Sequence, residues 1–264
     1  MSKKENKAAI EENLPMVIDM ESDAGSGFEN ADVDTFIVPR IVVLQSNSPQ
    51  VDDEKPEFIK NSKPGMLLNT ATQEVYDGKV GMGMVICTYT RKFIEWADRA
   101  DGGGIQNVYN PAEGMAIQTE KRPEKEGNKD WVVGTNNNLV DTREHAVIVL
   151  LEGQDPFPAL MSFASTQVKK SKSLMTIMNS IKVPGAKGKF TPPLFANQWH
   201  MVTVGEENKK GSWKGYKFER LGLIQDAPLY TLAKGFAEQV NAGEVEAKEE
   251  SGGSAPDNDG ACPF

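Results

Sequence analysis

The pattern of apolar and polar positions divides the chain into three parts. Residues 1–34 and residues 241–264 have no sustained apolar period and are rich in Glu, Asp, Ser, Gly and Asn. Segments of this kind bury too little apolar surface to offset the entropy lost on folding. We therefore expect a disordered acidic N-terminal segment at 1–34, one folded domain at 35–240, and a disordered acidic C-terminal tail at 241–264.

Short apolar segments broken by Gly, Pro and Asn dominate the folded part. They are rich in β-branched and aromatic residues, which favours strands. The predicted strands lie in FIVPRIVVLQ, GKVGMGMVICTYTRKFIEWA, DWVVGT, HAVIVLLEG, ALMSFAS, QWHMVTVGEEN and GYKFERLGLI.

Two segments have the period of a helix instead. In STQVKKSKSLMTIMNSIKVPG the apolar residues fall at i, i+3, i+4 and i+7, namely Leu174, Ile177, Met178 and Ile181. Ser165 or Thr166 is available as its N-cap and Pro184 as its stop. A second helix is predicted at LYTLAKGFAEQVNAG, just before the acidic tail.

Antiparallel strands with one helix in the middle of their order are typical of a small Greek-key barrel. We expect a mainly β fold, an OB-fold-like Greek-key barrel with insertions and one inserted helix. A β-sandwich would produce much the same pattern.

Charge is distributed unevenly along the chain, whose net charge is −9. Residues 1–34 hold 3 Lys and 9 acids, and residues 241–264 hold 1 Lys and 6 acids. Residues 160–220 hold 11 Lys and Arg against 3 Glu, a local net charge of +8. A basic surface is therefore expected on an acidic protein, flanked by acidic ends.

Motifs of catalysis and metal binding are scarce. His145 and His200 have no Cys or carboxylate at ligand spacing, and Cys87 and Cys262 form no metal or disulfide pattern. GAKGKFT lacks the Ser or Thr that follows Lys in a P-loop, so we interpret it as a basic loop. No signal peptide or membrane span is evident. We expect a soluble intracellular protein that is not an enzyme, with no cofactor, no metal and no membrane partner.

Basic and aromatic residues alternate in three stretches, as binding of single-stranded nucleic acid requires: cations follow the phosphates while rings stack on bases. The first stretch supplies Tyr89, Arg91, Lys92, Phe93 and Trp96, with Tyr89, Arg91 and Phe93 on one face of a strand. The second supplies Lys169, Lys170, Lys172, Lys182, Lys187, Lys189 and Phe190. The third supplies Lys209, Lys210, Trp213, Lys214, Tyr216, Lys217, Phe218 and Arg220.

The aromatic residues of these strands are not expected to share one role. Phe93, Trp199 and Phe218 fit a hydrophobic core, where most strand aromatics lie. Trp213 and Tyr216 stand among lysines and glycines, so we predict that both are exposed.

The chain ends in a polar stretch that contains Asp257 and Asp259 and closes with Pro263 and Phe264. With a basic aromatic β-domain before it, this ending resembles the replicative single-stranded DNA-binding proteins of tailed bacteriophages and bacteria. Bacterial members close with Ile-Pro-Phe, whereas this chain has Cys262 before the Pro-Phe pair. NSKPGMLLNTATQEVYDG, YTRKFIEWADRADGGG and GSWKGYKFERLG also look like a phage group of OB-fold DNA-binding proteins, over about residues 36–224.

The resemblance implies a protein that coats and protects single-stranded DNA in phage replication, recombination or repair, in the cytoplasm of the infected bacterial host cell. It also implies that the tail docks replication or recombination proteins through Asp257, Asp259, Pro263 and Phe264, the ring entering an apolar pocket. Two alternatives stay open: a phage structural or scaffolding protein, and a strand-annealing recombination protein. An enzyme with a concealed site is a further one.

Overall fold

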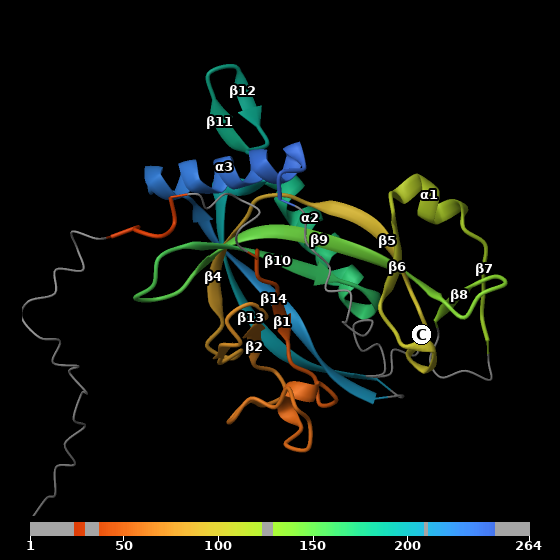
Figure 1. The fold of residues 1–264 in the computed structure, drawn as a ribbon. Helices are drawn as coiled ribbons and strands as arrows, with labels where there is room; N and C mark the ends of the chain where they lie inside the picture. The colour runs from red at the N-terminus through yellow and green to blue at the C-terminus, as the bar shows by residue number, and fades with distance from the viewer. Residues whose placement is uncertain (1–23, 30–36, 123–128, 209–210, 246–264) are drawn as a thin grey trace, which may run out of the picture. The chain divides into compact units, whose positions relative to one another are not determined.

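A computed structural model describes residues 24–29, 37–122, 129–208 and 211–245 (Figure 1). The chain divides into two compact units, Met1–Phe36 and Ile37–Phe264. In the first unit, the described residues form a turn closed by a 3.1 Å hydrogen bond from Phe28 N to Gly25 O. All strands and helices described below belong to the second unit.

The central strand of the largest sheet is β9 (Asn138–Leu150). One of its edges pairs with β5 (Thr90–Trp96) along its first half and with β4 (Met82–Ile86) along its second half. The other edge pairs with β8 (Asp130–Val132) and β10 (Phe157–Phe163). All these pairs are antiparallel. Because strands pair with both edges of β9, its apolar run HAVIVLL has strand neighbours on both sides.

Four more strands complete this nine-stranded sheet. β13 (Asn197–Asn208) pairs with β4, and β14 (Gly211–Leu223) pairs with β13 along nearly its whole length. At the other end of the sheet, β6 (Ile105–Tyr109) pairs with β5, while β7 (Thr119–Glu120) pairs with β8. The main order is therefore β14-β13-β4-β9-β5-β6.

Two smaller antiparallel sheets lie outside this order. One has the order β1-β2-β3 and is made by β1 (Ile41–Val43), β2 (Leu67–Asn69) and β3 (Val75–Tyr76). The other is a hairpin of β11 (Val183–Gly185) and β12 (Gly188–Phe190). Short 3-10 helices cover Pro49–Val51, Arg99–Asp101, Ser165–Gln167 and Leu194–Ala196.

The two helices predicted from the sequence are present. α3 (Ala227–Ala242) begins after Asp226, whose side chain accepts a hydrogen bond from Leu229 N, and it ends at Gly243 with φ 75°. α2 (Val168–Ser180) buries Leu174 and Met178. A third helix, α1 (Pro111–Ala116), was not predicted, although Asn110 and Glu113 form the reciprocal hydrogen bonds of a capping box.

The predicted ends of α2 were wrong. Ser165 and Thr166 lie in a 3-10 helix, and the N-cap is Gln167, which makes no side-chain cap hydrogen bond. At the other end, the helix stops at Ser180, and Pro184 belongs to β11. The segment predicted as a basic loop is therefore a β-hairpin.

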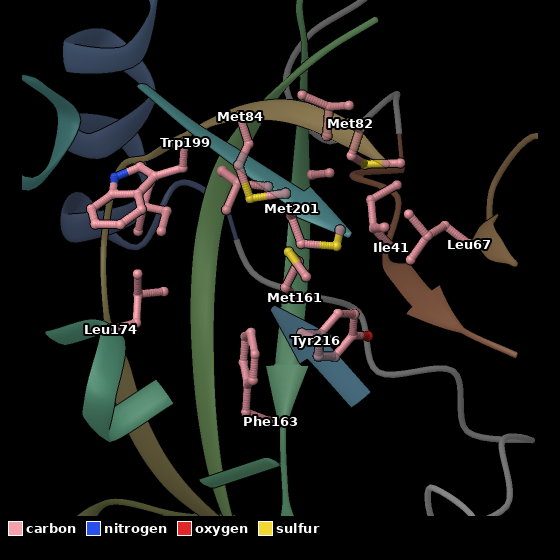
Figure 2. Packing of buried hydrophobic residues seen from close by; sticks show 14 of the residues in the cluster. Ile41, Leu67, Met82, Met84, Met161, Phe163, Leu174, Trp199, Met201 and Tyr216 are labelled. Carbon is pink, nitrogen blue, oxygen red and sulfur yellow. The ribbon is translucent and has the colours of Figure 1, made fainter. Parts of the chain in front are cut away.

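The core has two parts, on opposite faces of the large sheet. Val147 and Val149 of β9 belong to one cluster with Leu174 and Met178 of α2, while Ala146 and Ile148 belong to the other. Because successive residues of a strand point to opposite faces, α2 covers one face. The second face is covered by α3, through Leu229, Ala233, Phe236 and Ala237. Figure 2 shows the first cluster, in which methionines pack between Trp199 and Ile41.

The fold is mainly β with antiparallel sheets and few helices, as predicted, but no ladder of hydrogen bonds closes the described strands into a barrel. β1 lies beside β10, where Leu160 N donates to Pro39 O at 2.8 Å. On its other side, Val43 N donates to the hydroxyl of Tyr216 at 3.1 Å. The side-chain amide of Gln45 then bonds both the N–H and the carbonyl of Lys214, at 2.8 and 2.9 Å. Side chains, rather than a ladder, connect β1 to β14.

Candidate nucleic-acid interface

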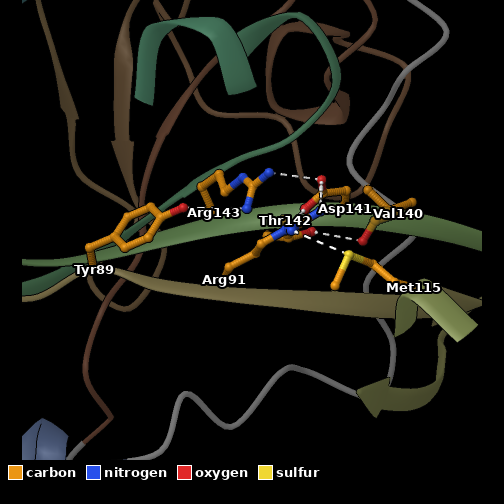
Figure 3. A network of polar contacts seen from close by, with 7 residues as sticks. All are labelled: Tyr89, Arg91, Met115, Val140, Asp141, Thr142 and Arg143. Atoms are coloured by element: carbon orange, nitrogen blue, oxygen red, sulfur yellow. Dashed lines mark hydrogen bonds and ion pairs between the residues drawn. The ribbon is translucent and has the colours of Figure 1, made fainter. Parts of the chain in front are cut away.

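The first predicted stretch forms a polar network on one face of β5 (Figure 3). Arg91 donates two hydrogen bonds to Asp141, at 3.1 and 2.9 Å. Arg143 shares that carboxylate at 2.9 Å and donates to the Tyr89 hydroxyl at 3.3 Å. The hydrogen bond to Asp141 raises the pKa of Arg91. Arg91 is therefore engaged by an acid of its own chain.

The remaining residues of this stretch are buried or form an ion pair. Phe93 is buried as expected: a Cβ on Gly114 of α1 would lie 2.3 Å from its ring. The guanidinium of Arg91 lies 4.8 Å from the centre of the same ring. Trp96 is buried, and Lys92 pairs with Glu144 at 3.2 Å.

Tyr89 connects this network to α2 through His145. The two rings are 5.3 Å apart, and His145 Nε2 lies 2.8 Å from the hydroxyl of Ser171 on α2. Burial lowers the pKa of His145 to about 4. Both histidines therefore have structural contacts, since His200 Nε2 donates to the carbonyl of Val80 at 3.0 Å.

The second and third stretches meet at Glu206 of β13. Its carboxylate pairs with Lys170 of α2 and accepts a 2.8 Å hydrogen bond from Trp213 Nε1 of β14. Beside it, Gln167 accepts from Tyr216 N at 3.2 Å. α2 thus contacts β14 directly and is connected to Tyr89 of the first stretch through His145 of β9.

The predicted exposure of Tyr216 was wrong, because only 4% of this residue is accessible. Its ring packs 5.2 Å from that of Phe163, and burial raises the pKa of its hydroxyl. Tyr216 and Phe218 are two residues apart and both point to the inner face of β14. Phe218 is therefore partly buried against the same cluster. Trp213 is half-buried rather than exposed as predicted, and its Nε1 donates to Glu206. Trp199 is fully buried, as expected for the core.

Exposed cations gather on α2 and on the hairpin that follows it. Lys169 and Lys172 are exposed on α2, and Lys187 and Lys189 are exposed on the hairpin. Among the described residues these four lysines have no acidic partner. We call residues 168–191 the basic arm.

The basic arm is marked in the sequence by a local absence of acidic residues. No Asp or Glu occurs between Asp155 and Glu206, whereas this interval contains six lysines. An interval without acids leaves its lysines no local ion-pair partner, which favours solvent-facing positive charge.

The basic residues of β14 differ in exposure. Lys217 and Arg220 are exposed, and Arg220 Nε donates to the side chain of Asn197 at 2.9 Å. Lys214 is half-buried and its stem lies over Gly65, where a Cβ would be 3.4 Å away. The other predicted site residues lie outside the described residues: Lys209, Lys210, Asp257, Asp259, Pro263 and Phe264.

The described part of the chain contains no group of three or more His, Cys, Asp or Glu side chains arranged to hold a metal ion. Among the described helices, none combines the length and apolar character needed to cross a membrane.

Comparison with known proteins gives one match. No curated protein and no solved structure matches the chain. A family model described as Pam3 phage gp34-like protein matches residues 3–246, which is most of the chain. The chain therefore belongs to the Pam3 phage gp34-like family of bacteriophage proteins.

Proposed function

We propose that this protein binds single-stranded DNA without catalysing a reaction, and that it coats and protects exposed strands in phage replication, recombination or repair. The observation that carries the proposal is the basic arm, where four exposed lysines have no acidic partner among the described residues. Unpaired lysines keep their charge available for phosphates, and the release of counterions then drives binding.

The arrangement around α2 supports a nucleic-acid surface rather than an isolated cluster of charge. Trp213 lies beside the start of the basic arm through Glu206, and Lys217 and Arg220 add cations on the same strand. The OB-like relationship belongs to this proposal as well. It is supported by a curved antiparallel sheet and by a helix inserted between β10 and β13, although side chains take the place of a closing ladder.

The acidic tail is proposed to recruit replication or recombination proteins in the cytoplasm of the infected host cell. Its sequence supports this role, since the acidic side chains and the aromatic ring of Phe264 suit capture by an apolar pocket with a basic rim. Deletion of Phe264 should leave DNA affinity unchanged and weaken capture of those proteins about ten- to hundredfold, the effect of removing one buried ring. Equal capture by both forms would exclude the ring from recruitment.

The proposed DNA binding is tested by titrating labelled oligo(dT) and a duplex of equal length with the full chain at several salt concentrations. If about 3–5 phosphates are neutralised, log K for oligo(dT) should fall with log salt at a slope of roughly −2 to −3.5. Equal affinity for both DNAs would favour the structural or scaffolding alternative. No binding to either would refute the proposal.

A matched pair of variants locates the surface. Replacing Lys169, Lys172, Lys187 and Lys189 with Ala should weaken binding at low salt about a hundredfold and flatten the salt slope. The control replaces four lysines that are also exposed but lie outside the basic arm: Lys55, Lys60, Lys63 and Lys79. The control should bind nearly as the natural protein does. Equal losses in the two variants would show that net charge, and not the basic arm, decides affinity.

A further inference from the structure

Phe190 is the most exposed aromatic residue in the described part of the second unit. Its accessible fraction is 49%, compared with 39% for Phe58 and 37% for Tyr230. The aromatic residues of the first and third predicted stretches are instead buried or half-buried. Among the aromatic residues of the three stretches, Phe190 is therefore the one most accessible to a ligand.

The hairpin holds this ring in a defined orientation. Phe190 of β12 pairs with Val183 of β11, and the ring lies over the backbone of Gly185. A Cβ on Gly185 would lie 2.9 Å from ring atom Cδ1, so only glycine leaves room for this contact. Gly188, with φ +111°, adopts a backbone conformation that other residues rarely take and closes the turn. One side of the ring rests on glycine.

Packing of the core does not account for the ring. All residues from 184 to 191 are exposed, and in Figure 1 the hairpin extends away from the large sheet. Phe190 belongs to neither hydrophobic cluster and stays 49% accessible. An accessible aromatic face can stack on a base.

Positive charge surrounds the ring. Lys187 occupies the turn, and Lys189 lies next to Phe190 on the opposite face of the hairpin. Lys182, at the base, donates to Asn179 O at 3.1 Å and to the hydroxyl of Thr191, which ties the hairpin to the end of α2. The nearest acids in the sequence are Asp155 and Glu206.

We propose that the β11–β12 hairpin is a base-stacking element, in which Phe190 stacks on an unpaired base while Lys187 and Lys189 neutralise neighbouring phosphates. The inference rests on the proposed function and specifies its partner as a single strand. Bases in a duplex are already stacked on each other, whereas bases of a single strand offer free faces to an aromatic ring. The hairpin, rather than Tyr216 or Phe93, would then supply the preference for single strands.

The first experiment compares Phe190→Leu and Phe190→Tyr in the full chain, with oligo(dT) and a duplex of equal length as ligands. Leucine keeps an apolar group over Gly185 but removes the flat ring, so affinity for oligo(dT) should fall at least about fivefold. Tyrosine keeps the ring and should restore most of that affinity. Phe58→Leu, a change of the same kind at an exposed ring outside the basic arm, should have no effect.

The second experiment uses Phe190→Trp as a reporter. Stacking on a base should quench the added tryptophan fluorescence when oligo(dT) binds, beyond the quenching seen in the natural protein.

The two lysines are tested separately. Lys187→Ala with Lys189→Ala should flatten the salt slope by about 1.4, the value for two phosphate contacts on a single strand.

The outcomes separate this inference from the proposed function. If the natural protein binds oligo(dT), but Phe190→Leu binds equally well and Phe190→Trp shows no added quenching, the hairpin inference is overturned and the proposed function stands. If Phe190→Leu and Phe190→Tyr weaken binding equally, an aromatic ring at this position is not sufficient for binding, and the inference again fails. If the natural protein does not bind oligo(dT), both are refuted.

Discussion

Two cationic regions of this fold contain similar residues but differ in their neighbours. Around β5, Arg91 and Arg143 share Asp141, and Arg143 also contacts Tyr89. On the basic arm, Lys169, Lys172, Lys187 and Lys189 are exposed, with no acidic partner among the described residues. The cations of the first region are paired with an acid of the fold, while the four lysines of the second are exposed to solvent.

The comparison teaches that a run of basic and aromatic residues does not itself define a binding surface. Both regions satisfy the same sequence pattern. They differ in whether a carboxylate from another strand arrives beside the cation, and Asp141 is separated from Arg91 by 50 residues. Four changes, given in order of decreasing effect, test this distinction.

Asp141→Asn should destabilise the fold by about 3 kcal/mol, because Arg143, whose side chain is 5% exposed, would lose its carboxylate partner. Urea unfolding of the variant and of the natural protein measures the difference. Asp130→Asn is the matched control, since the Lys121–Asp130 pair is about half exposed and should contribute less than about 1 kcal/mol. Equal effects of the two changes would place the β5 network among ordinary surface charges.

Stability should fall by about 2 kcal/mol between pH 7.5 and pH 5 because of His145. Burial lowers its pKa in the folded protein to about 4 from an ordinary value of 6.5, and the charge of Glu144 opposes this shift. The unfolded chain therefore takes up a proton first, so stability is complete above about pH 6.5 and is lost as the pH falls toward 4. Urea unfolding at both pH values, with His145→Asn as control, measures it. An unchanged pH dependence in His145→Asn would exclude this residue as the cause.

Glu206→Gln converts a paired lysine of the basic arm into an unpaired one. The ion pair with Lys170 is partly exposed, so its loss should cost about 1 kcal/mol or less in unfolding free energy. The released lysine should raise affinity for oligo(dT) by about two- to fivefold at low salt, with a steeper salt slope. Weaker binding by the variant would show that the position of Trp213, which Glu206 also holds, matters more than the added charge.

The smallest effect is expected from Lys169→Ala with Lys172→Ala, which should change the unfolding free energy by less than about 0.5 kcal/mol. Both side chains are exposed, and alanine favours a helix at least as well as lysine. Thermal unfolding measures the change. A loss of about 2 kcal/mol or more would show that these lysines serve the fold, and the contrast between the two regions would disappear.

Local patterns predicted much of the fold from the sequence. Leu174 and Met178 at helical spacing identified α2, and the segment that contains Leu229 and Phe236 identified α3, because burying one helical face leaves a visible period. The alternation of residues in β14 also indicates that Tyr216 is buried. Tyr216 and Phe218 lie two residues apart and share the inner face, but the lysines around them suggested exposure.

The candidate site was harder to predict, because its character depends on pairs that are distant in sequence. Nothing near Lys170 shows that Glu206 will pair with it, and nothing near Phe93 shows that Gly114 will cover its ring. The absence of acids between Asp155 and Glu206 was visible, and it marks the lysines that remain exposed. A local absence of acidic residues is visible in a sequence, whereas an ion pair between distant residues is known only once the fold is known.

Two glutamines along the free edge of β14 affect how copies of this protein behave at high concentration. β14 is the last strand of the large sheet, and such edges can add strands from other molecules and begin aggregation. Gln45 and Gln167 accept hydrogen bonds from the N–H groups of Lys214 and Tyr216 on this strand. A foreign strand would have to displace both side chains before it could pair there. The two side chains therefore shield this part of the edge from neighbouring copies of the protein.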